Sequence, residues 1–157
     1  MVKKTYQVEI NDEKNIAKAI KANAHVSLKY STEMVRELKG KPVDKAEKFL
    51  QRILAHEDFL PLRKYVKKIG HRKGKTGTAT GKFPEKICKA FLELIASAKA
   101  NAINKGLDEK KLIIQHMFAS EGYRRVSYQS KGKIGGKRRH NKSTHIEIIV
   151  REAKGLW

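Results

Sequence analysis

The side chains in this sequence that are best suited to chemistry are cations, and they are concentrated in two segments. The first is residues 120–143, where Arg124, Arg125 and six further Lys or Arg face a single acid, Glu121. Guanidinium groups bind phosphate through two parallel hydrogen bonds. Tyr123 and Tyr128 lie among these cations, and aromatic rings stack on unpaired bases. This combination predicts contacts with RNA.

The second segment is residues 60–83, which reads as an inserted basic loop. Its residues 61–82 contain eight Lys or Arg, four Gly and no acid. Neither segment is expected to fold unaided, so we expect RNA to order both. The predicted RNA-binding residues are Arg63, Lys64, Lys67, Lys68, His71, Arg72, Lys73, Lys75, Lys82, Tyr123, Arg124, Arg125, Tyr128, Lys131, Lys133, Lys137, Arg138, Arg139, His140, Lys142 and His145.

Two glycine-rich motifs in these segments resemble known phosphate-binding loops without fitting them. Residues 70–76 read GHRKGKT, which has three residues between the first Gly and the Gly-Lys-Thr, whereas a P-loop requires four. Residues 132–135 read GKIG and match the GXXG loop of KH domains, but that loop lies between helices and strands are expected here. We interpret these glycines as positions where the backbone can approach phosphate closely.

The remaining reactive side chains do not predict catalysis or metal binding. His56, Glu57 and Asp58 form the nearest acid–base cluster, but no Cys or second His lies at ligand spacing. The Ser and Thr beside His145 lack a carboxylate to orient the imidazole. Cys88 reads as a small buried residue on a helix. We therefore expect no enzyme, cofactor or metal; an RNA-modifying or processing enzyme with a basic arm, and a free-standing nucleic-acid chaperone, remain as alternatives.

The composition of the whole chain favours a polyanionic partner. Among 157 residues, 36 Lys or Arg oppose 16 Asp or Glu, and the formal net charge is +20. A compact fold with this charge repels itself unless a partner neutralises it. Nucleic acid is favoured over a membrane surface, because no apolar run approaches the ~20 residues that span a bilayer. No secretory signal is expected, and a single cysteine is typical of a reducing intracellular compartment.

Apolar residues at spacings of three and four predict three helices. Asp44 and Glu47 read as a capping box at the start of the second helix, and Pro84 reads as the first residue of the third. The expected helices run from Ser27 to Gly40, from Asp44 to Leu54 and from Pro84 to Gly106.

Two segments rich in β-branched residues, Lys111–Ala119 and Thr144–Glu152, predict strands. Further strands are expected at Lys21–Val26 and Thr5–Ile10. A structureless loop over the 24 residues 120–143 would be unusual inside a compact domain. We therefore expect the two later strands to continue outward as a two-stranded ribbon that reaches about 40 Å. Gly132, Gly135 and Gly136 are expected near its tip.

Four segments resemble the universal ribosomal large-subunit protein twenty-two family, which is called protein seventeen in older eukaryotic naming. Residues 36–46 are similar to its junction between two helices, RELKGKPVDKA, and residues 92–104 to its third helix, LELIASAKANAIN. Residues 118–126 resemble the start of its hairpin, FASEGYRRV, and residues 141–152 its returning strand, NKSTHIEIIVRE. The basic loop departs from the shorter bacterial pattern and is similar to the archaeal and eukaryotic branch.

The resemblance implies an α+β fold, with three helices on a small antiparallel sheet and a long extended hairpin. Residues 1–157 would form one ribosomal-protein domain, with a body of residues 1–119 and 144–157 and an arm of residues 120–143. It implies a structural constituent of the large ribosomal subunit whose hairpin passes through rRNA and lines the nascent-peptide exit tunnel. The implied partners are large-subunit rRNA, neighbouring large-subunit proteins and nascent peptide, in the cytoplasm.

Overall fold

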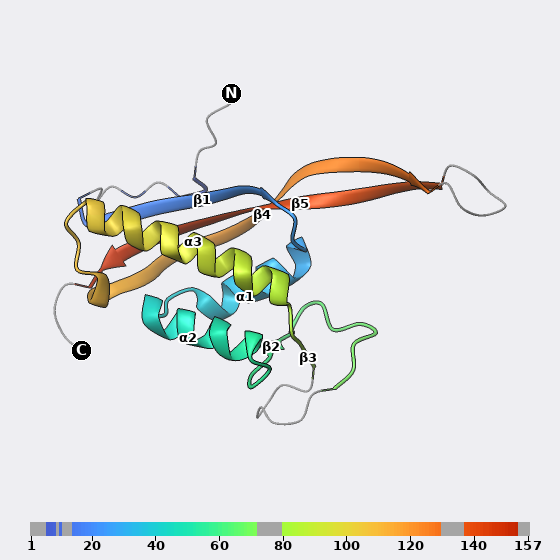
Figure 1. The fold of residues 1–157 in the computed structure, drawn as a ribbon, viewed down its shortest axis with the longest axis horizontal. Helices are drawn as coiled ribbons and strands as arrows, with labels where there is room; N and C mark the ends of the chain where they lie inside the picture. The colour runs from blue at the N-terminus through green and yellow to red at the C-terminus, as the bar shows by residue number, and fades with distance from the viewer. Residues whose placement is uncertain (1–5, 9, 11–13, 72–79, 130–136, 154–157) are drawn as a thin grey trace.

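The computed structural model describes residues 6–8, 10, 14–71, 80–129 and 137–153. Three helices cover one face of an antiparallel sheet (Figure 1). The sheet has the order β1-β5-β4 and consists of β1 (Ile16–Ala24), β5 (Lys137–Glu152) and β4 (Leu112–Gln129). The helices are α1 (Leu28–Leu38), α2 (Val43–Leu54) and α3 (Glu85–Asn104). The smaller elements are a two-stranded sheet of β2 (Leu60–Pro61) and β3 (Gly81–Lys82), and the 3-10 turn η1 (Glu109–Lys111). The predicted α+β class is confirmed.

The central strand β5 has the alternation that its sequence predicts. Ile146, Ile148 and Val150 are completely buried in the core beneath the helices. Glu147 lies on the opposite face but is only 3% exposed. Its Oε1 accepts a hydrogen bond from the backbone N–H of Gln7 at 3.1 Å and lies 3.4 Å from Nε2 of His116. The N-terminal segment therefore covers this part of the open face.

The first strand begins and ends earlier in the chain than the sequence predicted. Strand β1 spans Ile16–Ala24 rather than Lys21–Val26, and it pairs antiparallel with β5. Its sequence is rich in alanine, which has little preference for strands, but Ile16 and Ala17 are completely buried. Pairing and burial therefore form this strand. In the range 5–10, the described residues 6–8 and 10 are not in a strand, so the fourth predicted strand is wrong there.

The helices lie where their periodicity predicts, but the capping box does not form. Helix α2 begins at Val43 after Pro42, and no side chain caps it. The carboxylates of Asp44 and Glu47 instead lie 3.4 and 2.8 Å from Nζ of Lys99 on α3. The predicted box was wrong because the helix begins before Asp44: Pro42 is the N-cap, and Asp44 is the second helical residue. Pro84 was expected to be the first residue of α3, but the helix begins at Glu85 and Pro84 is its N-cap.

The turn between α1 and α2 is attached to β4. Gly40 has a positive φ of 81°, which favours glycine. Its N–H donates to the carbonyl oxygen of Ile114 at 2.9 Å, and the N–H of Ile114 donates to the carbonyl oxygen of Lys41 at 3.0 Å. These two bonds fix the helical layer against the sheet. None of the helices in the described ranges has the length and apolar character needed to cross a membrane.

The predicted two-stranded ribbon is present. Beyond the body, β4 and β5 stay paired from Arg124 with Lys142 to Gln129 with Lys137. Figure 1 shows this hairpin projecting far beyond the helical layer. The predicted glycine tip, residues 132–136, lies outside the described residues.

Candidate nucleic-acid interface

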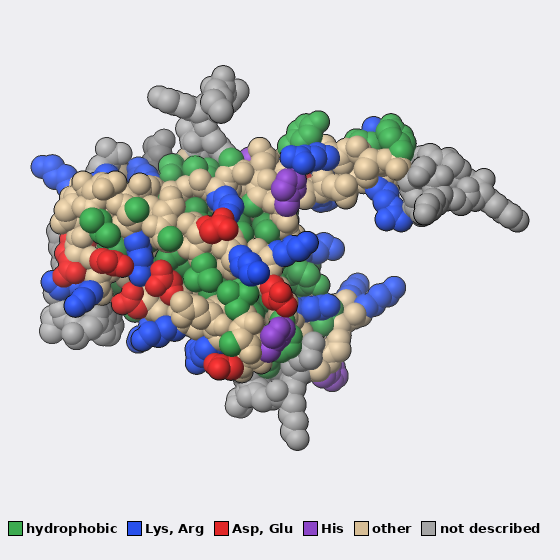
Figure 2. Space-filling model, in the orientation of Figure 1, with side chains coloured by type: hydrophobic (Ala, Val, Ile, Leu, Met, Phe, Trp, Pro, Cys, Tyr) green, Lys and Arg blue, Asp and Glu red, His purple; other side chains and the backbone are tan. Residues whose placement is uncertain are grey.

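Two basic arms leave the body at the end where α1 and α3 begin (Figure 1). We call residues 120–143 the hairpin arm and residues 60–83 the basic loop. Figure 2 shows Lys and Arg side chains on both, with an open notch between them. The two cation-rich segments found in the sequence are thus brought to the same end of the molecule.

The hairpin arm has two faces of different composition, because residues paired across antiparallel strands point to the same side. One face contains Arg124 with Lys142, Val126 with His140, and Tyr128 with Arg138. The other contains Arg125 with Asn141, and Ser127 with Arg139. Tyr123 and Tyr128 are 68% and 69% exposed, and Val126 is 41% exposed. One face can therefore offer apolar and aromatic surface beside its cations, whereas the other is polar and cationic.

Glu121, the single acid of the hairpin arm, neutralises cations where the arm meets the body. It forms a hydrogen-bonded ion pair with Nε of Arg124, and Nζ of Lys142 lies 3.5 Å from its Oε1. The hydrogen bond from Arg124 lowers the pKa of Glu121 below its ordinary value, and Glu121 in turn raises the pKa of Arg124. Glu121 therefore offsets part of the positive charge where the arm meets the body.

A polar cluster joins the base of the hairpin arm to the end of β1. We define this root cluster as Asn23, Gly122, Tyr123, Ser143 and His145. Oδ1 of Asn23 accepts a hydrogen bond from the N–H of Tyr123 at 3.1 Å, and the N–H of Asn23 donates to Nδ1 of His145 at 3.1 Å. The Ser143 hydroxyl donates to the carbonyl oxygen of Tyr123 at 2.7 Å and lies 3.2 Å from Oδ1 of Asn23.

The backbone of the root cluster adopts conformations that suit its residue types. Asn23 has a positive φ of 52°, which Asn tolerates better than most residues. The pairing register shifts between Glu121 and Arg124, which is a β-bulge at Gly122. A Cβ at Gly122 would lie 2.7 Å from both Oδ1 of Asn23 and Oγ of Ser143. Only glycine fits there without displacing these side chains.

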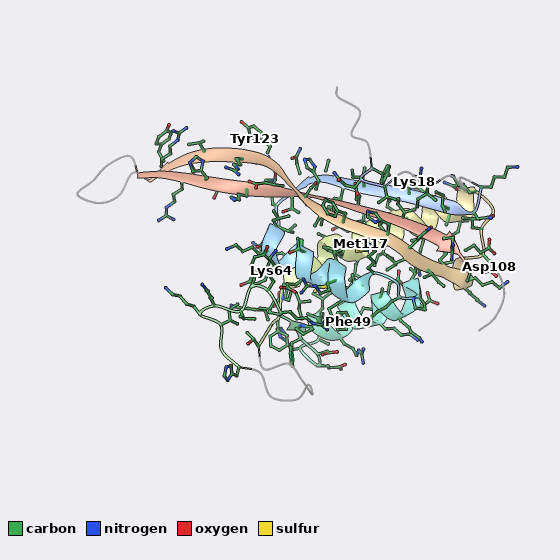
Figure 3. All side chains as sticks on the ribbon, turned by 180° about the vertical axis from the view of Figure 1, so that it is seen from behind. Lys18, Phe49, Lys64, Asp108, Met117 and Tyr123 are labelled. Atoms are coloured by element: carbon green, nitrogen blue, oxygen red, sulfur yellow. The ribbon has the colours of Figure 1, made fainter. Side chains whose placement is uncertain are left out.

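The basic loop is attached to α1 by a buried acid. Glu33 is 2% exposed, and its Oε1 accepts hydrogen bonds from the backbone N–H groups of Lys64 at 2.7 Å and Tyr65 at 3.3 Å. Its Oε2 accepts from Nη1 of Arg36 at 3.0 Å. A buried carboxylate requires such partners. In Figure 3, Lys64 lies close to α1, where this attachment forms.

The two ends of the basic loop are held together by a small sheet. Leu60 pairs with Lys82 and Pro61 with Gly81, and Leu60 is completely buried. A Cβ at Gly81 would lie only 2.1 Å from the ring of Phe59, so a side chain at Gly81 would collide with the aromatic ring. The stem of the loop is thus part of the folded body, and residues 72–79 lie outside the described residues. That RNA orders the basic loop stays a prediction.

Most of the predicted RNA-binding side chains are exposed on the two arms. The exposed ones are Arg63, Lys64, Lys67, Lys68, His71, Lys82, Tyr123, Arg124, Arg125, Tyr128, Arg138, Arg139, His140 and Lys142. His145 is half-buried and belongs to the root cluster. The backbone of Lys137 pairs with Gln129. Arg72, Lys73, Lys75, Lys131 and Lys133 lie outside the described residues. RNA contact by each of these side chains stays a prediction.

Sequence reasoning missed the positioning residues Asn23, Gly122 and Ser143. An isolated Gly inside a strand pattern is a known sign of a bulge, so Gly122 offered a signal. Asn23 offered none, because its partners lie about a hundred or more positions away in the chain. Glu33 was also missed, because its partners Lys64 and Tyr65 are 31 and 32 positions away and nothing in the nearby sequence marks it as a buried anchor.

Other reactive groups in the described residues do not gather into a site. No group of three or more His, Cys, Asp or Glu among them could hold a metal ion. Cys88 is free and completely buried, as its place on a helix predicted. Burial raises the pKa of its thiol to about 11. His56 is exposed and its Nε2 lies 3.5 Å from Oε1 of Glu85, which is a surface pair rather than a cluster with Glu57 and Asp58.

Comparison with known proteins agrees with this architecture. The family model for ribosomal protein L22p/L17e matches residues 19–151. A large ribosomal subunit protein uL22 from Methanocaldococcus jannaschii is 35% identical over 152 residues, covering 97% of each chain. The protein of the same name from Methanopyrus kandleri is 37% identical over 147 residues, with 92% of this chain and 91% of the relative covered. That from Staphylothermus marinus is 33% identical over 150 residues, with 94% and 96% covered. These relatives are archaeal, and this chain belongs to the ribosomal protein L22p/L17e family.

Proposed function

We propose that this chain is a structural constituent of the large ribosomal subunit, in the cytoplasm, and that it binds large-subunit rRNA through the hairpin arm and the basic loop. The single observation that carries the proposal is the projection of both cation-rich segments from one end of the body (Figure 2). Membership in a ribosomal protein family supports rRNA as the polyanion. Neighbouring large-subunit proteins are further partners.

The contacts would go mainly to phosphate. Lysine and arginine neutralise phosphates and release counterions, which gives affinity without reading the sequence. The exposed Tyr123 and Tyr128 add stacking on unpaired bases. Specificity then comes from the shape of the folded RNA, because two arms with a fixed relation to the body fit only certain RNA surfaces.

The same proposal places the hairpin arm along the nascent-peptide exit tunnel, with nascent peptide as a partner of its tip. Two features support this placement: the arm extends well beyond the body as a narrow two-stranded ribbon (Figure 1), and the chain belongs to a large-subunit protein family. A ribbon without its own hydrophobic core is marginally stable in water. The surrounding rRNA would supply the missing support.

Sedimentation of ribosomes in high salt tests the proposal. A stably assembled constituent remains with the large subunit after a wash that strips loosely bound factors. A nucleic-acid chaperone, or a processing enzyme that binds transiently, would move to the soluble fraction. Release of the full chain by moderate salt would therefore contradict the proposed function.

A further inference from the structure

The face of the main sheet that the helices leave open carries buried side chains of its own. Strand pairing places Ile149 between Lys18 of β1 and His116 of β4, and residues paired across antiparallel strands share a face. Ile149 is completely buried, although it points away from the core that Ile148 and Val150 enter. Something other than the three helices must therefore cover it. We call this side of the sheet the back face.

The described N-terminal residues Tyr6, Gln7 and Val8 lie against the back face, and we call them the strap. The N–H of Gln7 donates to Oε1 of Glu147 on β5 at 3.1 Å. Nζ of Lys18 on β1 lies 5.9 Å from the ring centre of Tyr6. Burial and then the charge of Glu147 raise the pKa of Tyr6, which agrees with a ring held near this carboxylate. The strap therefore contacts the back face over two of its strands.

Glu147 is the point at which the strap is fastened. Its side chain is almost completely buried, and its Oε1 also lies 3.4 Å from Nε2 of His116. Burial of a carboxylate is costly unless hydrogen-bond donors satisfy its oxygens. The strap supplies one donor from its backbone at Gln7, so this bond does not depend on the side chain at that position. Loss of the donor would leave the carboxylate to recover its hydrogen bond from water.

The fastening point lies next to the root cluster of the hairpin arm. Glu147 pairs with Phe118, and the next pair on the same face joins His145 to Ser120. His145 belongs to the root cluster, where its Nδ1 accepts a hydrogen bond from the N–H of Asn23. Water that entered beside Glu147 would therefore reach the hydrogen bonds that hold the base of the arm.

We infer that the strap helps to position the hairpin arm, and that Glu147 is the positioning residue through which it acts. With the strap closed, the carboxylate of Glu147 stays dry and the root cluster keeps its hydrogen bonds. With the strap open, water enters the back face beside His145, and the arm is held less firmly. This device acts within the protein itself and does not depend on rRNA, so it goes beyond the proposed function.

Amide hydrogen exchange in the purified full chain, followed by NMR, tests the inference. Gln7→Pro removes the N–H that binds Glu147, whereas the matched control Gln7→Ala keeps it. In Gln7→Pro the root amides of Asn23 and Tyr123 should exchange faster by about tenfold or more, because a hydrogen bond to a charged group is lost. The amide of Gly40, which is bonded on the helical side of the sheet, should exchange as in the native protein. Equal root exchange in the two variants, or equal acceleration at Gly40, would overturn the inference.

Substitution of Glu147 itself gives a second test with the same measurement. Glu147→Gln keeps a side-chain oxygen that can accept the N–H of Gln7, so it should preserve most of the protection of the root amides, whereas Glu147→Ala should lose it. Glu57→Ala removes an exposed acid elsewhere and should change nothing at the root. Equal loss of protection in Glu147→Gln and Glu147→Ala would contradict the role of Glu147 as an acceptor. If Glu147→Ala does not fold, Gln7→Pro still decides, because it leaves every residue of the sheet in place. These measurements need no RNA, so their failure would leave the proposed function intact.

Discussion

Single residues of the root cluster decide where the hairpin arm points. Asn23 uses a left-handed backbone conformation to present both its N–H and its side-chain oxygen to β4 and β5. The hydroxyl of Thr144 adds a hydrogen bond to the carbonyl oxygen of Val26 at 2.8 Å. These bonds connect the arm to the turn that precedes α1, so the ribbon is not held by its strand pairing alone.

Substitution of Gly122 tests this role. A Cβ in Gly122→Ala would overlap Asn23 and Ser143, and relief of the overlap requires breaking their hydrogen bonds. We expect a loss of about 1–3 kcal/mol in the free energy of unfolding, measured by chemical denaturation. Gly70→Ala is the matched control, because a Cβ at Gly70 meets nothing within 4 Å. Equal stability of the two variants would contradict the proposed packing at the bulge.

Cys88 offers a test of the packing of α3. Because burial raises the pKa of its thiol to about 11 and the thiolate is the reactive form, iodoacetamide at pH 8 should label the unfolded chain but not the folded one. The unfolded thiol has a pKa near 9.0 and loses its proton first, so the contribution of this group to stability falls as pH rises from 9.0 toward 11. Rapid labelling of the folded protein would show that α3 opens readily.

At the scale of elements, α1 positions the basic loop and β4 with β5 position the hairpin arm. Both arms are therefore extensions of elements that pack in the core, rather than free tails. Glu33 is the link for the loop, because it satisfies two backbone N–H groups that would otherwise be unpaired. Through this link, the direction of the loop depends on α1.

Substitution of Glu33 should loosen the loop more than it perturbs the arm. Glu33→Ala removes the acceptor for the N–H groups of Lys64 and Tyr65, which costs about 1–3 kcal/mol of stability. Limited trypsin digestion should then cut faster at Arg63, Lys64, Lys67 and Lys68, all of which are exposed. Glu93→Ala is a suitable control, because the side chain of Glu93 is 68% exposed. Unchanged digestion in Glu33→Ala would contradict the anchoring role.

At the scale of the whole molecule, the chain combines a folded body with an arm that has little core of its own. Most of the fully buried side chains come from the helices and from β1, β4 and β5, and Leu60 of β2 adds to them. The arm instead exposes Tyr123, Val126 and Tyr128. Body and arm should therefore respond differently to truncation.

Removal of residues 125–141, with Arg124 and Lys142 joined by an Asn-Gly turn, should leave a body that unfolds cooperatively. The root contacts of Tyr123 and Ser143 are kept in this variant. Its binding to large-subunit rRNA should be weaker and less dependent on salt, because Arg125, Arg138 and Arg139 are lost. Denaturation followed by circular dichroism measures the first effect, and filter binding at several salt concentrations the second. A truncated chain that cannot fold would contradict this division into body and arm. The longer removal of residues 123–142 should fold less stably, because it also removes Tyr123 from the root.

The sequence by itself determined the features that depend on local periodicity and charge. The helical spacing of apolar residues in α3, the alternation of Ile146, Ile148 and Val150, and the two acid-poor cationic segments are all local patterns. They were sufficient to predict the three helices, the two later strands, the ribbon and the surfaces expected to contact RNA. The sequence placed the alanine-rich strand β1 too late in the chain, because pairing with β5 forms this strand despite its weak local preference.

Only the tertiary structure decided which polar residues hold the arms. Lys99 binds Asp44 and Glu47 from more than fifty positions away in the sequence, and the partners of Asn23 lie still farther away. A buried polar group is stabilised by whichever partner the fold places within hydrogen-bonding distance. That distance depends on how the helices and strands pack together, and no spacing in the sequence records it.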